Sequence, residues 1–192
     1  NSAFTSITGY MPEDVMGQNP NILQSGRHDK TFYKQLWHAI QSKGSWTGEI
    51  YNRRKDGELY LQNLTIKVLH DAIGDTENHI AMFTDITHER QYNQQLKYLS
   101  EHDVLTGLPN RILLQQEFEF SLATAKRNGK MLGLLYLDLN NFKPVNDQFG
   151  HLYGDELLQV LAGRMQSCIR ETDMVARIGG DEFIVLVSDV EN

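Results

Sequence analysis

Two glycines and three acidic residues in this chain have the types and spacing of a metal-dependent site. Gly179, Gly180, Asp181 and Glu182 lie between apolar runs of β-strand character within residues 174–187. Two such runs joined by a glycine-containing turn predict a β-hairpin. A further apolar run ends at Asp138. If the hairpin pairs beside that run, three carboxylates converge, as an Mg²⁺ site acting on phosphates requires.

Four segments resemble motifs of one known family. Residues 179–183, Gly-Gly-Asp-Glu-Phe, resemble the signature of the GGDEF family, the diguanylate cyclases. Residues 103–111, 138–147 and 149–155 resemble three further motifs of that family, in the family's order. The resemblance covers residues from about 100 to 192, roughly the first half of such a domain.

The resemblance implies a bacterial signalling enzyme that condenses two GTP molecules into cyclic di-GMP and two pyrophosphates. It implies Mg²⁺ or Mn²⁺ as the cofactor, with Asp138, Asp181 and the backbone carbonyl of Leu139 as ligands. Glu182 matches the other acidic position, either as a ligand or, with Asp181, as a catalytic group that draws off the hydroxyl proton. The alternative is that these acids merely solvate a hairpin and a strand end.

The same resemblance implies how the substrate is held. Phe142, Lys143 and Gly180 match positions that contact GTP, with backbone N–H groups of the loop after Asp138 holding phosphates. Asn146 and Asp155 match residues that read guanine, because paired polar contacts discriminate between bases. Lys143 as a plain surface lysine, and Asp155 as the cap of a helix over 155–169, stay open. A helix over 111–127 is expected to open at Pro109 or Asn110 and to end at Asn128-Gly129. Residues 140–147 are expected to form a polar turn.

Arg170 and Asp173 form the last candidate site of this half. They occupy the offset from Gly179 at which the family binds its product, so the resemblance implies an inhibitory site for cyclic di-GMP. The alternative is a salt bridge that closes the preceding helix. Position 140 is Asn where the family pattern often has Asp. The alternative function is that of a GGDEF module without turnover. Such a module binds GTP or cyclic di-GMP and regulates a partner or an appended phosphodiesterase domain. If the chain is a fragment, it is expected to be inactive alone.

Residues 1–86 differ in pattern from the rest. Helices are expected over 12–16 and 31–43, the second with Asp29 as its cap and Gly44 after it. Strands are expected over 46–52, 59–69 and 79–84, with a hairpin turn at Asp56-Gly57 and a loop over 71–78. Segments 4–10, 48–50, 52–57 and 84–87 resemble a PAS sensor domain whose opening strands are missing. Trp46 and Asn52 match ring-contacting positions of flavin-binding relatives, which suggests FAD, against the alternative of a packed core tryptophan. No Cys follows Asn19, so cysteinyl–flavin photochemistry is unsupported.

Residues 87–101 are predicted to be a helical linker. Tyr92, Leu96 and Leu99 recur at helical spacing and form a narrow apolar seam. Two interpretations stay open, a connector resting on one domain and a two-stranded coiled coil. The resemblance favours the coiled coil, and therefore a homodimer.

Together these segments predict a fold class and a domain plan. An α+β PAS-like domain spans residues 1–86, and an α/β GGDEF domain with a mixed sheet, a palm like that of nucleotidyl cyclases, spans residues 102–192. The helical linker joins them.

Composition sets the remaining bounds. The net charge of −7 argues against a nucleic-acid-binding surface, and 40% hydrophobic residues suffice for a buried core. No apolar run reaches membrane-spanning length. Cys168, on the apolar stripe of residues 157, 161 and 165, is predicted to be a buried thiol, which fits a reducing cytoplasm. The chain opens without Met, so a fragment is expected, and a membrane anchor elsewhere in its parent stays open.

Overall fold

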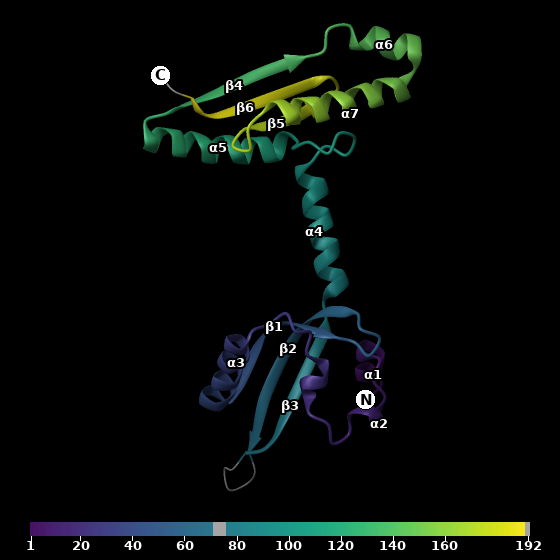
Figure 1. The fold of residues 1–192 in the computed structure, drawn as a ribbon, viewed down its shortest axis with the longest axis vertical. Coiled ribbons are helices and arrows are strands. Elements are labelled where there is room, and N and C mark those ends of the chain that lie inside the picture. The colour runs from purple at the N-terminus through teal and green to yellow at the C-terminus, as the bar shows by residue number, and fades with distance from the viewer. Residues whose placement is uncertain (71–75, 191–192) are drawn as a thin grey trace. The chain divides into compact units, whose positions relative to one another are not determined.

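The computed structural model describes residues 1–70 and 76–190, and the chain divides into two compact units, residues 1–93 and 94–192 (Figure 1). The first unit contains α1 (Ser2–Thr8), α2 (Pro12–Val15), η1 (Pro20–Leu23), α3 (Lys30–Lys43), β1 (Ser45–Arg53), β2 (Leu59–His70) and β3 (Thr76–Asp85). The second contains α5 (Arg111–Asn128), β4 (Met131–Asp138), α6 (Phe142–Phe149), α7 (His151–Cys168), β5 (Met174–Gly179) and β6 (Glu182–Val190). Helix α4 (Thr87–Glu101) runs across the division.

The first unit is an antiparallel sheet in the order β1-β2-β3 with helices packed on it. The β1–β2 turn contains Asp56 and Gly57, as predicted. The expected loop over 71–78 lies partly outside the described residues, and its last part is wrong because β3 begins at Thr76. The meander confirms the predicted α+β character of this unit.

Helix α3 follows the predicted rules at both ends. The Asp29 carboxylate accepts a hydrogen bond from the Phe32 N–H (2.8 Å), and Gly44 ends the helix with φ 71°. Leu36 and Ile40 are buried, whereas Trp37 is 50% exposed although it shares the apolar spacing. The apolar stripe is wider than the face that the sheet covers. Helices α1 and η1 were not predicted; both begin at an Asn side chain that accepts a backbone N–H.

The second unit has a sheet in the order β4-β6-β5, and every pair is antiparallel. The α/β class is confirmed, but the expectation of a mixed sheet is wrong for the described strands. Strands β4 and β5 are both antiparallel to β6 and therefore run parallel to each other. The hairpin inserts β6 between them, so they never pair.

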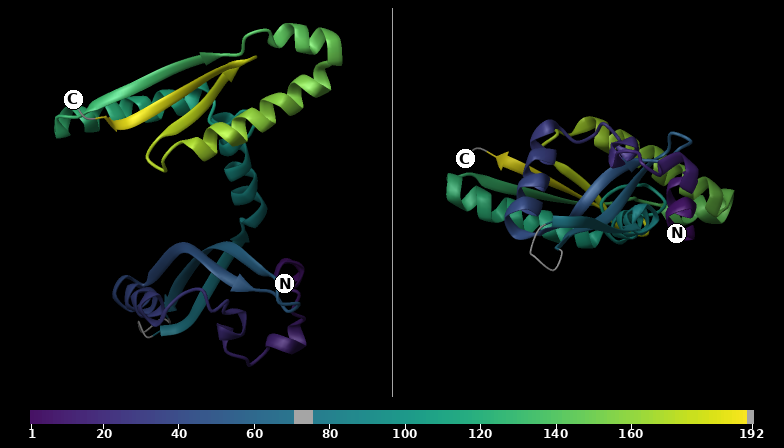
Figure 2. Two further views of the ribbon diagram at one scale, coloured as in Figure 1. Left: turned by 45° about the horizontal axis from the view of Figure 1, so that its top comes forward. Right: turned by 90° about the horizontal axis from the view of Figure 1, so that it is seen from below.

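Helices α5 and α7 cover opposite faces of this sheet (Figures 1 and 2). Leu158 and Ala162 of α7 pack with Val175, Phe183 and Val185. Leu114 of α5 packs with Ala176 and Leu186. Because Val175 and Ala176 are successive strand residues, the two clusters lie on opposite sides of the sheet. We call these sides the α7 face and the α5 face.

The predicted bounds agree with the structure for one long helix of this unit and not for the other. Helix α5 begins at the Asn110 cap and ends at Gly129, as predicted. Helix α7 begins at His151, not at residue 155. Cys168 is exposed, so the prediction of a buried thiol is wrong. The buried row of α7 is Gly154, Leu158 and Ala162, which lies beside the predicted stripe.

Among the described residues, no helix combines the length and hydropathy needed to cross a membrane.

Candidate functional site

The acidic residues of the hairpin lie beside the end of β4. Gly180 and Asp181 connect β5 to β6, and Gly180 has φ 55°, which favours glycine. Asp138 is the direct β4 partner of Glu182. Since opposite residues of an antiparallel pair share a face, these two carboxylates both lie on the α5 face. The predicted pairing of the hairpin with β4 is therefore confirmed.

The predicted convergence of three carboxylates is not seen. Within the described ranges, no group of three His, Cys, Asp or Glu side chains is arranged to hold a metal ion. Asp138 is exposed, whereas Asp181 and Glu182 are half-buried. A hydrogen bond to the Glu182 carboxylate, together with burial, raises the pKa of the Tyr136 hydroxyl. The negative charge at this edge of the sheet therefore affects a neighbouring side chain. The donor set, three carboxylates and a carbonyl, is chemically suited to Mg²⁺.

The segment after Asp138 is a helix where a polar turn was expected. Helix α6 starts at Phe142 behind Asn141, which takes a left-handed conformation with φ 65°. Pro144 does not prevent the helix because it lies in the first turn, where its missing N–H is not needed. The α6 N-terminus therefore follows the metal-ligand candidates within a few residues.

Three predicted residues lie at this start of α6. The Leu139 carbonyl accepts a hydrogen bond from the Phe142 N–H (3.3 Å) and retains a second lone pair. The Phe142 side chain packs against the α7-face core, so only its backbone faces the loop. Lys143 is exposed.

Helices α6 and α7 pack together and carry one predicted guanine-reading residue each, Asn146 on α6 and Asp155 on α7. Asn146 Oδ1 is buried and has no hydrogen-bond partner among the described residues. It lies 1.9 Å from the point that a Cβ on Gly154 would occupy. Gly154 directly precedes Asp155 in the chain. Asp155 lies in the first turns of α7 and does not cap it; the cap position is Gly150.

Arg170 and Asp173 form a local turn after α7. The Asp173 carboxylate accepts hydrogen bonds from the N–H groups of Ser188 (3.0 Å) and Arg170 (3.3 Å). The Arg170 residue is exposed. Asp173 therefore fastens the turn to β6, and its carboxylate keeps further lone pairs for a ligand.

In the first unit, Trp46 and Asn52 lie on the same face of the sheet but have different surroundings. Asn52 is buried, and its amide is best satisfied when it donates to the Leu23 carbonyl (2.9 Å) and accepts from Gln62 Nε2 (3.1 Å). Asn52 lines a cavity of about 250 Å³ whose other lining residues include Tyr33, Leu36 and Ile50. The Trp46 ring packs on Gly48 and Phe32 and does not line this cavity. FAD binding stays a prediction.

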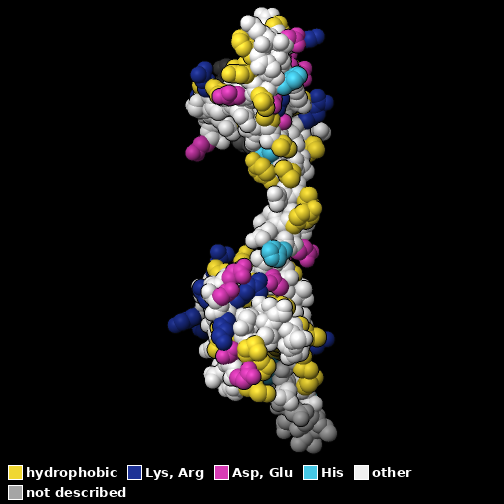
Figure 3. Space-filling model, turned by 90° about the vertical axis from the view of Figure 1, so that its right-hand side faces the viewer, with side chains coloured by type: hydrophobic (Ala, Val, Ile, Leu, Met, Phe, Trp, Pro, Cys, Tyr) yellow, Lys and Arg dark blue, Asp and Glu magenta, His cyan; other side chains and the backbone are white. Residues whose placement is uncertain are grey.

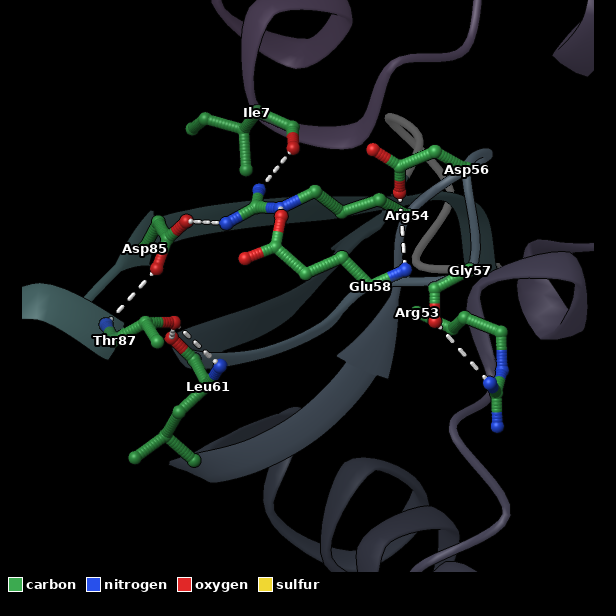
Figure 4. Close-up of polar contacts among 9 residues, drawn as sticks. All are labelled: Ile7, Arg53, Arg54, Asp56, Gly57, Glu58, Leu61, Asp85 and Thr87. Carbon is green, nitrogen blue, oxygen red and sulfur yellow. Dashed lines mark hydrogen bonds and ion pairs between the residues drawn. The ribbon is translucent and has the colours of Figure 1, made fainter.

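A polar cluster joins the end of β3 to the rest of the first unit (Figure 4). The Arg54 guanidinium pairs with Asp85 (2.5 Å) and Glu58 (2.9 Å), donates to the Ile7 carbonyl and lies over the Tyr60 ring. Asp85 also accepts from the Thr87 N–H (2.9 Å), and Thr87 Oγ1 accepts from the Leu61 N–H (2.9 Å). We call Arg54, Asp85 and Thr87 the Asp85 cluster.

Burial by itself would raise the pKa of the Asp85 carboxyl. The hydrogen bonds from Thr87 and Arg54 outweigh it, so the pKa is lowered. The carboxylate is therefore ionised at neutral pH and the ion pair with Arg54 is complete.

The second unit contains a comparable group, which we call the Asp103 cluster: Asp103, Thr106 and Arg177. Arg177 Nη1 pairs with the Asp103 carboxylate (2.8 Å), and Thr106 donates to the same oxygen through its N–H (2.9 Å) and Oγ1 (2.6 Å). Burial raises the pKa of Asp103, but these hydrogen bonds lower it by more.

The predicted seam of the linker helix is open to solvent. Tyr92, Leu96 and Leu99 are 63%, 47% and 46% exposed, and α4 has no buried residue. Hydrophobic side chains are visible along this helix in the space-filling view (Figure 3). The coiled-coil interpretation of this seam stays a prediction.

Comparison with known families agrees with both halves. Residues 1–88 match the model of the PAS domain family, and residues 100–192 match the family described as diguanylate cyclase, GGDEF domain. The chain therefore consists of a PAS domain followed by a GGDEF domain. The predicted resemblance and architecture are confirmed.

Individual relatives carry names from both sides of cyclic di-GMP metabolism. The cyclic di-GMP phosphodiesterase PdeR of Escherichia coli is 36% identical over 185 residues, covering 95% of this chain and 27% of PdeR. The probable diguanylate cyclase DgcE of the same species is 33% identical over 156 residues, covering 81% of this chain and 14% of DgcE. The chain thus spans only a small share of these relatives.

One solved structure resembles the second half. The coiled coil and GGDEF domain of DgcB from Caulobacter crescentus, in complex with c-di-GMP, is 27% identical with a TM-score of 0.52. The match covers 55% of this chain and 56% of that one.

Sequence reasoning missed three residues that the geometry singles out. Arg54 and Arg177 are charged residues of ordinary appearance whose partners are 31 and 74 positions away. Gly154 carried a usable signal, because a glycine inside a helix often marks the close approach of another group.

Proposed function

We propose that this chain is the sensor and catalytic-domain portion of a signal-regulated diguanylate cyclase. The observation that carries the proposal is the β4–β6 register, in which Asp138 lies opposite Glu182 with Asp181 in the adjoining turn. The match of residues 100–192 to the GGDEF family supports the same reaction. We place the reaction in the cytoplasm, where its substrate GTP is available.

The reaction joins two GTP molecules. The 3′-hydroxyl oxygen of each attacks the α-phosphorus of the other, the hydroxyl proton is transferred to a base, and each bond to pyrophosphate breaks. Glu182 or Asp181 is the group to accept that proton, because both lie at the edge where the phosphates would sit. When bound to Asp138, Asp181, Glu182 and the Leu139 carbonyl, Mg²⁺ or Mn²⁺ supplies charge stabilisation for this step.

The sides of the site have separate tasks. The first N–H groups of α6 and the backbone at Gly180 hold phosphates, and exposed Lys143 adds a positive charge. Asn146 Oδ1, which has no partner in the described structure, accepts from a guanine N–H, and Asp155 accepts from the same edge. Adenine presents no N1–H donor, so these acceptors favour GTP over ATP.

Each chain has one set of these residues, whereas the product is made from two GTP molecules. We therefore propose a two-fold homodimer in which the GTP sites face each other. The exposed seam of Tyr92, Leu96 and Leu99 is its contact in α4. Arg170 and Asp173 are proposed to bind cyclic di-GMP as an inhibitory site, since a guanidinium and a carboxylate can together pair with guanine edges and a phosphate.

A second candidate function is regulation without turnover. The specific observation is that PdeR, named as a phosphodiesterase, is similar over 95% of this chain. In this alternative the GGDEF domain binds GTP or cyclic di-GMP and controls an appended phosphodiesterase domain.

The deciding experiment is synthesis from GTP by the full-length protein. Asp181→Asn and Asp138→Asn should each lower cyclic di-GMP formation by on the order of 100-fold, because charge compensation at the metal is lost. Asp189→Asn is the control, since it removes an equal charge at the other end of β6 from an exposed residue. Near wild-type turnover in either site variant would disprove the assignment. A wild-type protein that binds GTP but makes no product would favour the second function.

A further inference from the structure

The Arg177 side chain reaches from β5 to the hairpin turn that precedes the acidic residues. Its Nε and Nη2 donate to the Gly180 carbonyl at 2.9 and 2.6 Å. Its Nη1 donates to Asp103 at 2.8 Å, and the side chain is only 10% exposed. One guanidinium therefore fixes a peptide group next to Asp181 and a carboxylate outside the sheet at once. The planar fork of Arg suits this double contact, which Lys cannot reproduce.

The turn that Arg177 holds is built from two glycines. Gly179 and Gly180 have φ of 154° and 55°, and a Cβ at either would meet nothing within 4 Å. Side-chain packing against a Cβ is therefore no restraint here, although Gly179 pairs with Glu182 in the β5–β6 ladder. Two successive glycines have the greatest backbone freedom of any residue pair, and ordering them costs conformational entropy. The paired hydrogen bonds from Arg177 to the Gly180 carbonyl add a side-chain restraint at the tip of the turn.

The other end of the contact belongs to the segment that leaves α4. The Asp103 N–H donates to the Leu108 carbonyl (2.7 Å), and the Gly107 N–H donates to the Asp103 carbonyl (2.8 Å). Asn110 ties this segment back to α4, through its N–H to the Glu101 carbonyl (2.9 Å) and its Nδ2 to the Ser100 carbonyl (2.8 Å). The Arg177 N–H donates to the Pro109 carbonyl (2.9 Å). These hydrogen bonds connect the segment that contains Asp103 to the last turn of α4.

We propose that Arg177 is a positioning residue for the acidic turn and that Asp103 makes its position depend on the end of α4. This inference rests on the proposed function only for the consequence on turnover. Moving or releasing the segment after α4 withdraws Asp103 from the guanidinium, and the Gly180 carbonyl then loses its fixed donors. The turn that carries Asp181 becomes mobile while the sheet beneath it stays paired.

The test uses hydrogen–deuterium exchange of the full-length protein, which reads the turn without requiring catalysis. Arg177→Lys keeps the charge but loses the fork, and Asp103→Asn keeps an oxygen for Thr106 but loses the ion pair. In both variants the amides of residues 180–182 should exchange about tenfold faster, with β4 and α5 amides unchanged. Arg164→Lys, at an exposed residue of α7, is the matched control and should leave the turn unchanged.

Coupling is measured by combining the two changes. If the guanidinium acts through Asp103, the double variant should exchange no faster than Arg177→Lys alone; multiplied effects would refute the dependence on α4. Unchanged exchange in folded Arg177→Lys would refute the positioning role. Where the protein turns over GTP, both variants should lower kcat about tenfold with a smaller change in KM. Faster exchange at the turn in a protein that makes no product would uphold this inference while the proposed function fails.

Discussion

The Asp85 and Asp103 clusters are built alike and stand at the two ends of one helix. Helix α4 begins two residues after Asp85 and ends two residues before Asp103. Each aspartate pairs with an arginine and accepts from a threonine a few residues further on. In each, the arginine also donates to a backbone carbonyl, that of Ile7, 47 positions from Arg54, or that of Gly180, three positions from Arg177.

The two clusters differ in which part of the molecule contains the carbonyl that the arginine binds. Arg54 donates to a carbonyl of α1 and lies over the Tyr60 ring, so the Asp85 cluster connects structural elements of its own unit. Arg177 binds a glycine turn that adjoins the candidate catalytic acids. The same three residue types therefore support the fold in one unit and hold a functional turn in the other. The role is set by what the arginine reaches.

The largest expected effect tests the structural side of this comparison. Arg54→Met should destabilise the first unit by about 3 kcal/mol, because Asp85 is left half-buried without its cation and the Tyr60 contact weakens. Urea unfolding followed by Trp fluorescence measures it. Lys34→Met, at an exposed residue of α3, should cost less than about 0.5 kcal/mol. Equal stability of Arg54→Met and wild type would mean that the Asp85 cluster is not structural.

A second test concerns the site beside the acidic turn. A Cβ on Gly154 would lie 1.9 Å from Asn146 Oδ1, so Gly154→Ala should displace that amide, weaken GTP binding about tenfold and destabilise the unit by about 2 kcal/mol. Calorimetric titration with a non-hydrolysable GTP analogue reads the affinity.

The control for this test is on the same helix. A Cβ on Gly163 would meet nothing within 4 Å, so Gly163→Ala should stabilise α7 by about 0.5–1 kcal/mol and leave binding unchanged. Equal GTP affinity in the two variants would mean that Asn146 does not contact the nucleotide.

Acid should weaken both clusters. The pKa of Asp85 and of Asp103 is lowered in the folded protein, so the stability that each contributes is complete above the unfolded value, about 3.9, and is lost as pH falls through the folded pKa. The Tm of each unit, followed from pH 7 to pH 2.5, should fall most steeply below about pH 4.

Asparagine variants assign this fall to its residues. Asp85→Asn should flatten the acid limb of the first unit, and Asp103→Asn that of the second. An acid limb that is unaltered in both would show that other carboxylates dominate it.

The smallest effect concerns the helix between the clusters. Leu96→Lys should weaken the proposed dimer about tenfold, because it places a charge on the exposed apolar seam. Gln95→Lys adds the same charge at the neighbouring exposed residue and should leave the dimer intact. Sedimentation at several concentrations compares them, and a fully dimeric Leu96→Lys protein would remove the seam from the interface.

Local chemistry in the chain was sufficient to predict much of this protein. The caps at Asp29 and Asn110, the stops at Gly44 and Gly129, and the hairpin at residues 179–182 follow from neighbours within a few positions. Strand pattern was sufficient to end a strand at Asp138, whereas its pairing with the hairpin was only a condition of the prediction, which the sheet fulfils. These features depend on short-range hydrogen bonds and backbone preferences, which a sequence carries directly.

Only the tertiary structure decided the features that depend on distant partners. The insertion of β6 between β4 and β5 makes the sheet antiparallel, and the choice of buried row in α7 leaves Cys168 exposed. The turn predicted after Asp138 became α6 because its first residue, Phe142, packs into the core. Arg177 gains its role from Asp103, 74 positions earlier. A residue's type and neighbours do not reveal which distant group its side chain reaches, because long-range packing brings the two together.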